Sequence, residues 1–299
     1  MLARFLRLLL LFELFGYFFA SLWLVRMAGW RPLGALLLMC LLAMAWRTWM
    51  IVVSYGFAWL HRAPVPTEFR LGMKRQLLEG VREVAALSAL LLAEAFDRIF
   101  PGADAPRRPA SGQLPLLLVH GYCCNRGFWW WLKPRLEAQG CSVATLSLEP
   151  LYGDIDRYAE QLARRVDWLC QASGASQVVL VGHSMGGLVA RAYLRRYGEM
   201  RVAKLVTLGT PHQGSMLAQL GLGRNARQME PASVWLRELA RAPLPLPCVA
   251  IFSWQDNYVV PQRNAIWPNA ENRPLAGVGH LAMSCSPVVL EALLAATAN

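Results

Sequence analysis

The sequence predicts an α/β fold in which helices flank a mostly parallel sheet, preceded by an N-terminal transmembrane helical hairpin. Three observations support this prediction. Two long apolar runs occupy the first 60 residues, strand-like and helix-like segments alternate after residue 113, and a glycine-flanked serine, Ser184, lies between one such strand and helix. A chain of 299 residues can hold one α/β domain and additional segments.

The apolar runs Leu8–Val25 and Leu33–Leu60 are both candidates to cross a bilayer, which takes about 20 apolar residues. The connection between them, residues 26–32, is short enough for a helical hairpin. A cleaved signal peptide is the alternative interpretation of the first run, but no convincing small-x-small cleavage site precedes the second run. We therefore expect residues 1–62 to form a retained membrane anchor.

The net charge of +11 favours an anionic membrane surface as partner over nucleic acid, because the basic residues are scattered and form no block. Basic residues are more frequent at the outer ends of the hairpin than in its loop: Arg4, Arg7, Arg62, Arg70, Lys74 and Arg75 against Arg26 and Arg31. The positive-inside rule then places both ends in the cytoplasm. The predicted location is the bacterial inner membrane, with the C-terminal domain cytoplasmic.

Residues 63–113 are predicted to hold an amphipathic helix and a linker. The apolar run Val84–Ala93 is too short to span a membrane and has charged residues at its edges, among them Glu83 and Glu94. Such a helix lies on the membrane surface or packs on the following domain. The stretch Pro101–Gln113 is rich in proline, alanine, glycine and arginine, which is typical of a linker.

The seven cysteines do not indicate a metal site, because their number is odd and their spacing matches no zinc pattern. Reduced thiols in a cytoplasmic domain are the preferred interpretation. The vicinal pair Cys123 and Cys124 leaves a redox role open.

Residues 114–299 alternate between the two element types, which predicts one domain built on a parallel sheet. The expected strands are Leu114–Val119, Ser142–Leu148, Gln177–Val181, Val202–Leu208, Cys248–Ser253 and Arg273–Val278. The expected helices are Trp130–Gln139, Asp156–Ser173, Gly187–Tyr197 and Ser286–Thr297. The carboxyl ends of parallel strands meet at one edge of the sheet, where the chemistry of such folds collects.

Ser184 lies in the segment Gly182–Gly187, directly after the third expected strand and before a helix. A strand, a sharp turn and a helix are the context of the G-x-S-x-G nucleophile elbow, in which only small residues fit two positions either side of the serine. This motif predicts a serine hydrolase with the α/β-hydrolase fold. An ordinary surface turn between a strand and a helix is the alternative interpretation of this motif, and the other motifs of the sequence argue against it.

A serine nucleophile needs a histidine base and a carboxylate that orients it, and in this fold the chain order is serine, acid, histidine. Asp256 is the single aspartate after Ser184, and His280 is the single histidine after Asp256. Each follows an expected strand, so both can reach the serine. His212 is a rival base and Glu271 a weak rival acid, whereas a packing role is expected for His183, within the elbow.

The oxyanion of the reaction needs two backbone N–H donors. Met185, the residue after the nucleophile, is expected to supply one. The other is expected from Tyr122, in the loop after the first strand, where Gly121 permits a close backbone approach.

The chain from Leu114 onward resembles bacterial triacylglycerol lipases and the related inositol-deacylase-like lipases. The carrying motifs are His120-Gly121-Tyr122, Gly182–Gly187, Leu208–Ser215, Asp256 and Gly279-His280. The resemblance implies carboxylic ester hydrolysis through an acyl-enzyme, with no cofactor. The two N-terminal apolar runs distinguish this sequence from those of secreted lipases, so extracellular fat digestion is not the expected function.

The segment 214–246 contains few strand signals and many apolar residues, and in similar enzymes a helical lid lies at this place. The aromatic run 128–131 lines an acyl pocket, meets the membrane interface, or belongs partly to the core. The predicted function is a membrane-anchored serine hydrolase that cleaves lipid acyl esters. Acyl transfer or thioester cleavage by the same triad, and an inactive scaffold with this fold, are the alternatives.

Overall fold

The computed structural model describes the chain except for residues 101, 103, 105–112, 242–243 and 299, so most of the predicted linker lies outside the described residues. Within the described part, six strands form one parallel sheet in the order β2-β1-β3-β4-β5-β6. The strands are β1 Leu116–Val119, β2 Val143–Thr145, β3 Val178–His183, β4 Val202–Leu208, β5 Cys248–Ser253 and β6 Glu271–Leu275. The predicted parallel α/β architecture is confirmed.

The second and last strands differ most from their predicted bounds. The second strand spans three residues, Val143–Thr145, instead of the seven expected. The last strand runs two residues earlier than expected at its start and ends at Leu275, because Gly277 adopts a left-handed backbone with φ of 71° and turns the chain. His280 therefore follows a turn and not a strand end.

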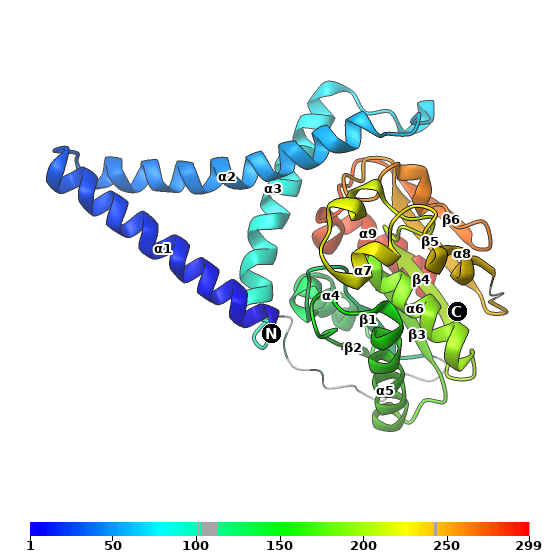
Figure 1. The fold of residues 1–299 in the computed structure, drawn as a ribbon. Helices are drawn as coiled ribbons and strands as arrows, with labels where there is room; N and C mark the ends of the chain where they lie inside the picture. Colours follow the sequence, from blue (N-terminus) through cyan, green and yellow to red (C-terminus); the bar gives the residue numbers. More distant parts are fainter. Residues whose placement is uncertain (101, 103, 105–112, 242–243, 299) are drawn as a thin grey trace.

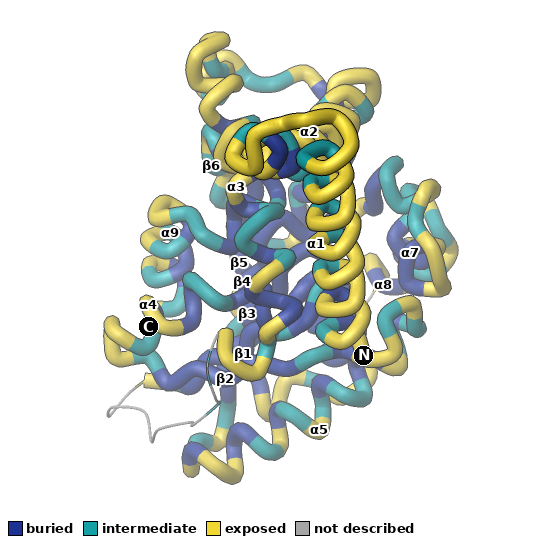
Figure 2. Tube along the Cα trace, turned by 90° about the vertical axis from the view of Figure 1, so that its left-hand side faces the viewer, coloured by how far each residue is buried: buried dark blue, intermediate teal, exposed yellow. Residues whose placement is uncertain are grey.

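Both faces of the sheet are covered by helices, and alternate residues of each strand face opposite cores. The flanking helices are α4 Leu132–Ala138, α5 Ile155–Ser173, α6 Met185–Tyr197, α7 Gly223–Gln228, α8 Val234–Arg241 and α9 Pro287–Thr297. Leu117 and Val119 pack with α5 and α6, whereas Leu116 and Leu118 pack with α4 and α9. Strands β1 to β5 form the buried centre of the domain in Figure 2, whereas the edge strand β6 is partly exposed.

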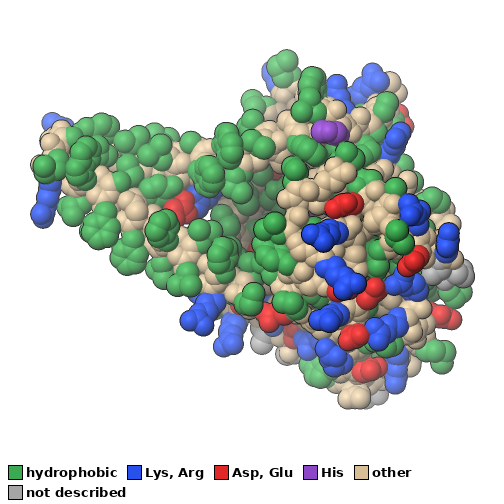
Figure 3. Space-filling view, viewed as in Figure 1, with side chains coloured by type: hydrophobic (Ala, Val, Ile, Leu, Met, Phe, Trp, Pro, Cys, Tyr) green, Lys and Arg blue, Asp and Glu red, His purple; other side chains and the backbone are tan. Residues whose placement is uncertain are grey.

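The N-terminal segment forms a hairpin of two long helices, α1 Leu2–Met27 and α2 Pro32–Leu60 (Figure 1). Both are long and apolar enough to be candidate membrane spans. Hydrophobic side chains cover the visible surface of the hairpin in Figure 3, and Phe12 is 78% exposed. So large an apolar surface is stable in lipid or against a partner, not in water.

One ion pair joins the two hairpin helices. Arg47 donates from Nη1 to Glu13 Oε1 at 2.8 Å and from Nη2 to Glu13 Oε2 at 2.9 Å, a bidentate arrangement. Charges placed at membrane depth are tolerated when they neutralise each other inside a helix bundle. The pair therefore fixes the register of α1 against α2 and keeps both charges away from the outer surface.

The predicted amphipathic helix is longer than expected and forms part of the domain. Helix α3, Met73–Ala95, crosses from the end of α2 to the start of α1, so that the three helices form a triangle beside the sheet domain (Figure 1). Ala86 and Leu90 of α3 belong to the same core as α4 and α9. Of the two interpretations left open by the sequence, the structure supports packing on the domain.

Candidate active site

Ser184 occupies the sharp turn between β3 and α6. Its backbone has φ of 53° and ψ of −123°, a conformation that L-residues rarely adopt and that marks a strained functional position. A Cβ on Gly182 would lie 2.4 Å from the backbone nitrogen of Gly187, and one on Gly186 would lie 2.3 Å from the carbonyl oxygen of Val119. The glycines are therefore required by space, as a nucleophile elbow demands.

His280 and Asp256 meet on the loops that follow β6 and β5. His280 Nδ1 lies 2.7 Å from Asp256 Oδ2, and both residues are buried. The other carboxylate oxygen of Asp256 accepts hydrogen bonds from the amides of Tyr258 and Val259, each at 2.8 Å. Three donors thus hold this carboxylate in place, and it orients the imidazole that lines the same cavity as Ser184.

The backbone amides of Met185 and Tyr122, predicted to bind the oxyanion, both belong to segments next to Ser184. Met185 is the first residue of α6, so its N–H has no intrahelical acceptor and lies at the positive end of the helix. Tyr122 follows Gly121, whose backbone runs so close to the nucleophile that a Cβ there would lie 3.0 Å from Ser184 Cβ. The predicted donors therefore flank the serine from two different loops.

His120 fixes the backbone of this second loop. Its Nε2 accepts from the amide of Leu148, and its Nδ1 donates to the carbonyl oxygen of Gly121, both at 2.9 Å. Burial lowers the pKa of His120 to about 4, which keeps the ring in the neutral form that can both donate and accept. The oxyanion loop is thereby held by a residue that takes no part in proton transfer.

The two alternative candidates, the base His212 and the acid Glu271, make their contacts away from Ser184. His212 is buried against Trp267 and lies 3.0 Å from Thr207 Oγ1 through Nε2. Glu271 is exposed on β6 and pairs with Arg273. Neither lines the cavity beside Ser184. His183 lines that cavity but stacks on Phe128 at 4.2 Å between ring centroids, which agrees with the packing role expected for it.

A cavity of about 490 Å³ opens beside Ser184, a size typical of ligand pockets. The segment after β4 covers one side of it with apolar residues, including Leu217 and Met229. Tyr122 ties this cover to the oxyanion loop, because its hydroxyl donates to the carbonyl of Leu222 and accepts from the amide of the same residue, both at 2.8 Å. The assignment of residues 214–246 as a lid stays a prediction.

The opposite wall of the cavity was not predicted. It is built by five apolar residues of the N-terminal helices: Leu6 of α1, Met50 of α2, and Leu87, Leu90 and Leu91 of α3. The three leucines of α3 follow a spacing that puts them on one helix face, and this was the only sequence signal for the contact. The candidate membrane spans thus contribute to the site of the sheet domain.

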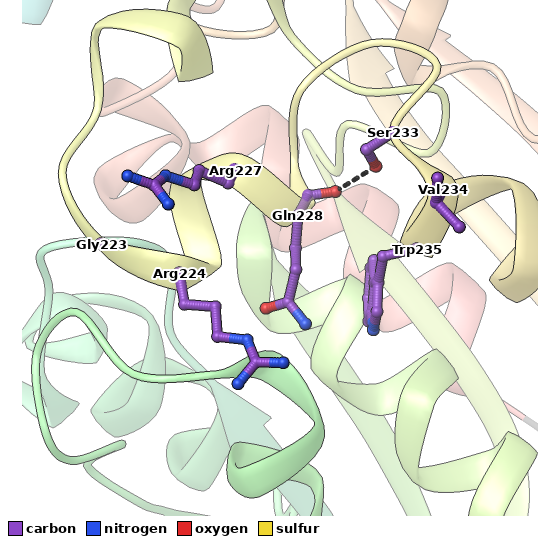
Figure 4. Close-up of a pocket in the computed structure, with 7 residues that line it drawn as sticks. All are labelled: Gly223, Arg224, Arg227, Gln228, Ser233, Val234 and Trp235. Atoms are coloured by element: carbon purple, nitrogen blue, oxygen red, sulfur yellow. Dashed lines mark hydrogen bonds between the residues drawn. The ribbon is translucent and has the colours of Figure 1, made fainter.

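A second cavity, of about 520 Å³, lies on the opposite face of α7 and contains no candidate catalytic group. Figure 4 shows the guanidinium group of Arg224 near the side chain of Gln228, whereas that of Arg227 points away from Gln228 and Trp235. Arg224 is paired with Asp154, with 3.0 Å between Nε and Oδ2. None of the residues lining this pocket lines the cavity beside Ser184, so it is not part of the candidate active site.

The surroundings of two acidic residues of α3 were not predicted. Glu83 and Glu94 lie at the edges of the apolar run, as the sequence indicated, and both are buried against loops of the candidate active site. The side chain of Asn125, in the loop after β1, donates to the carbonyl oxygen of Glu94 at 2.8 Å. Burial raises the pKa of Glu94 to about 8.

The raised pKa of Glu94 predicts a pH-dependent effect of the substitution Glu94→Gln. The folded protein holds the proton of Glu94 more tightly than the unfolded chain, so this residue lowers wild-type stability as the pH rises from about 4.5 to about 8. Glutamine lacks this penalty. We expect the melting temperature of the variant, relative to wild type, to be higher at pH 8 than at pH 5.5 in detergent. Glu68→Gln is the control for loss of one charge, and an equal difference at both pH values would contradict the prediction.

Comparison with known proteins gives similarities that cover part of this chain. Residues 115–245 match the family model described as alpha/beta hydrolase fold. A triacylglycerol lipase of Burkholderia plantarii is 34% identical over 126 residues, which cover 40% of this chain and 35% of that protein. A triacylglycerol lipase of Pseudarthrobacter phenanthrenivorans is 34% identical over 117 residues, 36% of each. The crystal structure of mature Bacillus licheniformis lipase BlEst2 superposes with a TM-score of 0.59 at 18% identity, over 64% of this chain and 94% of that chain.

The chain therefore has the α/β-hydrolase fold that the sequence predicted, and residues 115–245 are similar to the family of that name and to lipases. The chain spans about a third of the length of the two triacylglycerol lipases. The matched stretch 115–245 contains Ser184 but ends before Asp256 and His280. Among the residues that the structure describes, no cluster of three or more His, Cys, Asp or Glu side chains is arranged to hold a metal ion.

Proposed function

We propose that this protein is a membrane-anchored serine hydrolase that cleaves carboxylic acyl esters of membrane lipids. The observation that carries the proposal is the cavity lined by Ser184 and His280, because Leu6 and Met50 of the two candidate membrane spans line it together with leucines of α3. A soluble esterase has no need of such a wall. The similarity to triacylglycerol lipases supports the ester as the bond that is cleaved.

The proposed reaction runs in two steps. Ser184 Oγ attacks the ester carbonyl carbon while His280 takes its proton, and Asp256 stabilises the resulting imidazolium. The amides of Tyr122 and Met185 bind the negative carbonyl oxygen. His280 then returns the proton to the leaving alcohol, which departs and leaves an acyl-enzyme. Water, deprotonated by His280, attacks the acyl carbon and releases the acid and the free serine.

The walls of the cavity indicate where the acyl chain lies. Leu6, Met50 and Leu87 come from three different N-terminal helices and meet the cover segment across the cavity. A chain lying between these walls would reach Ser184 with its ester end, and its far end would point toward the hairpin. A lipid can then enter from the bilayer without its acyl chain passing through water, which would cost about 0.8 kcal/mol per exposed CH₂ group.

The substitution Leu87→Trp tests this placement by filling the cavity. We expect turnover of p-nitrophenyl esters with long acyl chains to fall about tenfold or more, while turnover of the acetyl ester stays within about twofold, because a short chain does not reach α3. The assay uses the full chain purified in detergent. Leu92→Trp, at an exposed position of the same helix, is the matched control. Equal loss on short and long chains would contradict the acyl placement.

Acyl transfer or thioester cleavage would proceed through the same acyl-enzyme. Attack on this intermediate by water gives hydrolysis, and attack by an acceptor alcohol gives transfer. Similarity to one relative supports acyl transfer as the second candidate reaction. This relative, a pig protein named 1-acylglycerol-3-phosphate O-acyltransferase ABHD5, is 27% identical over 146 residues. Product analysis with and without an added lysolipid acceptor separates the two reactions. A new diacyl product that depends on Ser184 would establish transfer, and free acid alone would establish hydrolysis.

A further inference from the structure

Helix α3 carries a carboxylate that the proposed reaction does not yet use. Glu83 is fully buried, and its two oxygens accept hydrogen bonds from the amides of Leu281 at 2.8 Å and Ala282 at 2.6 Å. These are the two residues that directly follow His280 in the chain. A side chain 198 and 199 positions away in sequence thus holds the backbone next to the candidate base.

The contact is close on the other side of His280 as well. A Cβ on Gly279 would lie 2.5 Å from Glu83 Cδ and 2.8 Å from the hydroxyl of Tyr55, so a glycine is needed for the helix to approach. Asn257 provides a second connection, because it accepts from the His280 amide at 3.1 Å. Its side chain also donates to Ser54 Oγ of α2 at 2.8 Å. The N-terminal helices therefore hold the His280 loop at several points.

Among the described residues, no lysine or arginine forms an ion pair with Glu83. The groups that face it are His280 and Asp256, which can carry charge, and Tyr55, Tyr258 and Cys285, which are neutral near pH 7. Burial raises the pKa of Glu83 to about 7, and the two amide hydrogen bonds partly oppose this rise. A buried carboxylate without a cation lowers stability unless its hydrogen bonds compensate. An apolar residue would fill this space at less cost, which indicates a role beyond packing.

We propose that Glu83 is a positioning residue for His280, so that the N-terminal segment completes the active site instead of only attaching it to a membrane. The inference rests on the proposed function of the triad. Glu83 fixes the loop through two amides, and its negative charge favours the imidazolium that forms when His280 takes the serine proton. The sheet domain without α3 would have a mobile base.

The substitution Glu83→Gln tests the proposal in the full-length protein purified in detergent. An amide oxygen can accept from one of the two backbone N–H groups, but the amide NH₂ cannot accept from the other. We expect kcat to fall about 10- to 100-fold with a KM change below about threefold, because misplacing a reacting group by about 1 Å costs about 10²-fold. We also expect the acidic limb of the pH–rate profile to move to lower pH, because the wild-type limb includes the ionisation of Glu83, whose pKa is about 7, and the glutamine variant has no such ionisation. A purely structural role would lower the melting temperature without moving the profile.

Two further variants make the test decisive. Glu79→Gln changes the same kind of side chain one turn away, where the carboxylate pairs with Arg82, and is expected to keep wild-type kcat. Glu83→Asp retains the charge but shortens the side chain by one CH₂ group, and is expected to lose part of kcat at a nearly unchanged melting temperature. Wild-type kcat and pH profile in Glu83→Gln would overturn the proposal. If that variant does not fold, wild-type kcat in Glu83→Asp would overturn it.

Labelling of Ser184 by a fluorophosphonate probe separates this inference from the proposed function. The probe reacts with a serine activated by its histidine and requires no correct substrate. Slower labelling in Glu83→Gln than in wild type would support the positioning role even if no lipid ester is hydrolysed. Equal labelling rates in the two proteins, with the control variant also unchanged, would overturn it even if ester hydrolysis is confirmed.

Discussion

Replacing Ser184 with alanine is expected to lower ester turnover by at least about 10³-fold, because no other group in the proposed mechanism can form the acyl-enzyme. Alanine has no Oγ, yet it retains the Cβ and the backbone of the elbow. The protein should therefore fold with a similar melting temperature, even though the left-handed backbone at this position remains strained. Hydrolysis of p-nitrophenyl esters by the detergent-purified full chain measures the effect.

Turnover by the alanine variant at the wild-type level would show that the hydrolysis comes from another residue or a contaminant, and would remove the proposed function. Absence of turnover in both proteins is a different result. If a fluorophosphonate probe labels folded wild-type protein at Ser184, the site is active and the substrate is wrong. If the probe labels nothing, the inactive-scaffold alternative gains support.

The second large effect is expected for Asp256→Asn, which should lower kcat by about 10⁴-fold. The carboxylate lies 2.7 Å from His280 Nδ1 and accepts two backbone amides, so asparagine fits the space. Its NH₂ group, however, would donate to Nδ1 and favour the imidazole tautomer that carries its proton on Nε2. That tautomer cannot take the serine proton. Steady-state kinetics on a p-nitrophenyl ester measure the loss.

Glu271→Gln is the matched control, since it removes the rival acid on β6. Glu271 is exposed and pairs with Arg273, so its loss should leave kcat within about twofold of wild type. The reverse pattern, with full activity in Asp256→Asn and a large loss in Glu271→Gln, would show that the acid was assigned wrongly.

Local sequence features were enough to predict the sheet domain and the candidate triad. The elbow requires a small residue at Gly182 because of its own turn, where a Cβ would meet Gly187, and at Gly186 because of the adjacent strand β1, so the motif is a strong predictor of this conformation. Chain order then left one aspartate and one histidine, Asp256 and His280, and the loops after β5 and β6 bring these two together. The two candidate membrane spans followed from length and hydropathy alone. The division into 1–62, 63–113 and 114–299, and the cytoplasmic side of the domain, stay predictions.

The role of α3 was decided by tertiary structure. The sequence predicted an amphipathic helix and left open whether it lies on the membrane surface or packs on the domain. In the folded chain, the carboxylates of Glu83 and Glu94 accept from backbone amides of the His280 loop and of the loop after β1. Residues separated by nearly 200 positions carry no shared local pattern. For this reason the sequence by itself determined which residues form the candidate triad, whereas only the packing of α3 against the sheet domain decided which residues surround and support it.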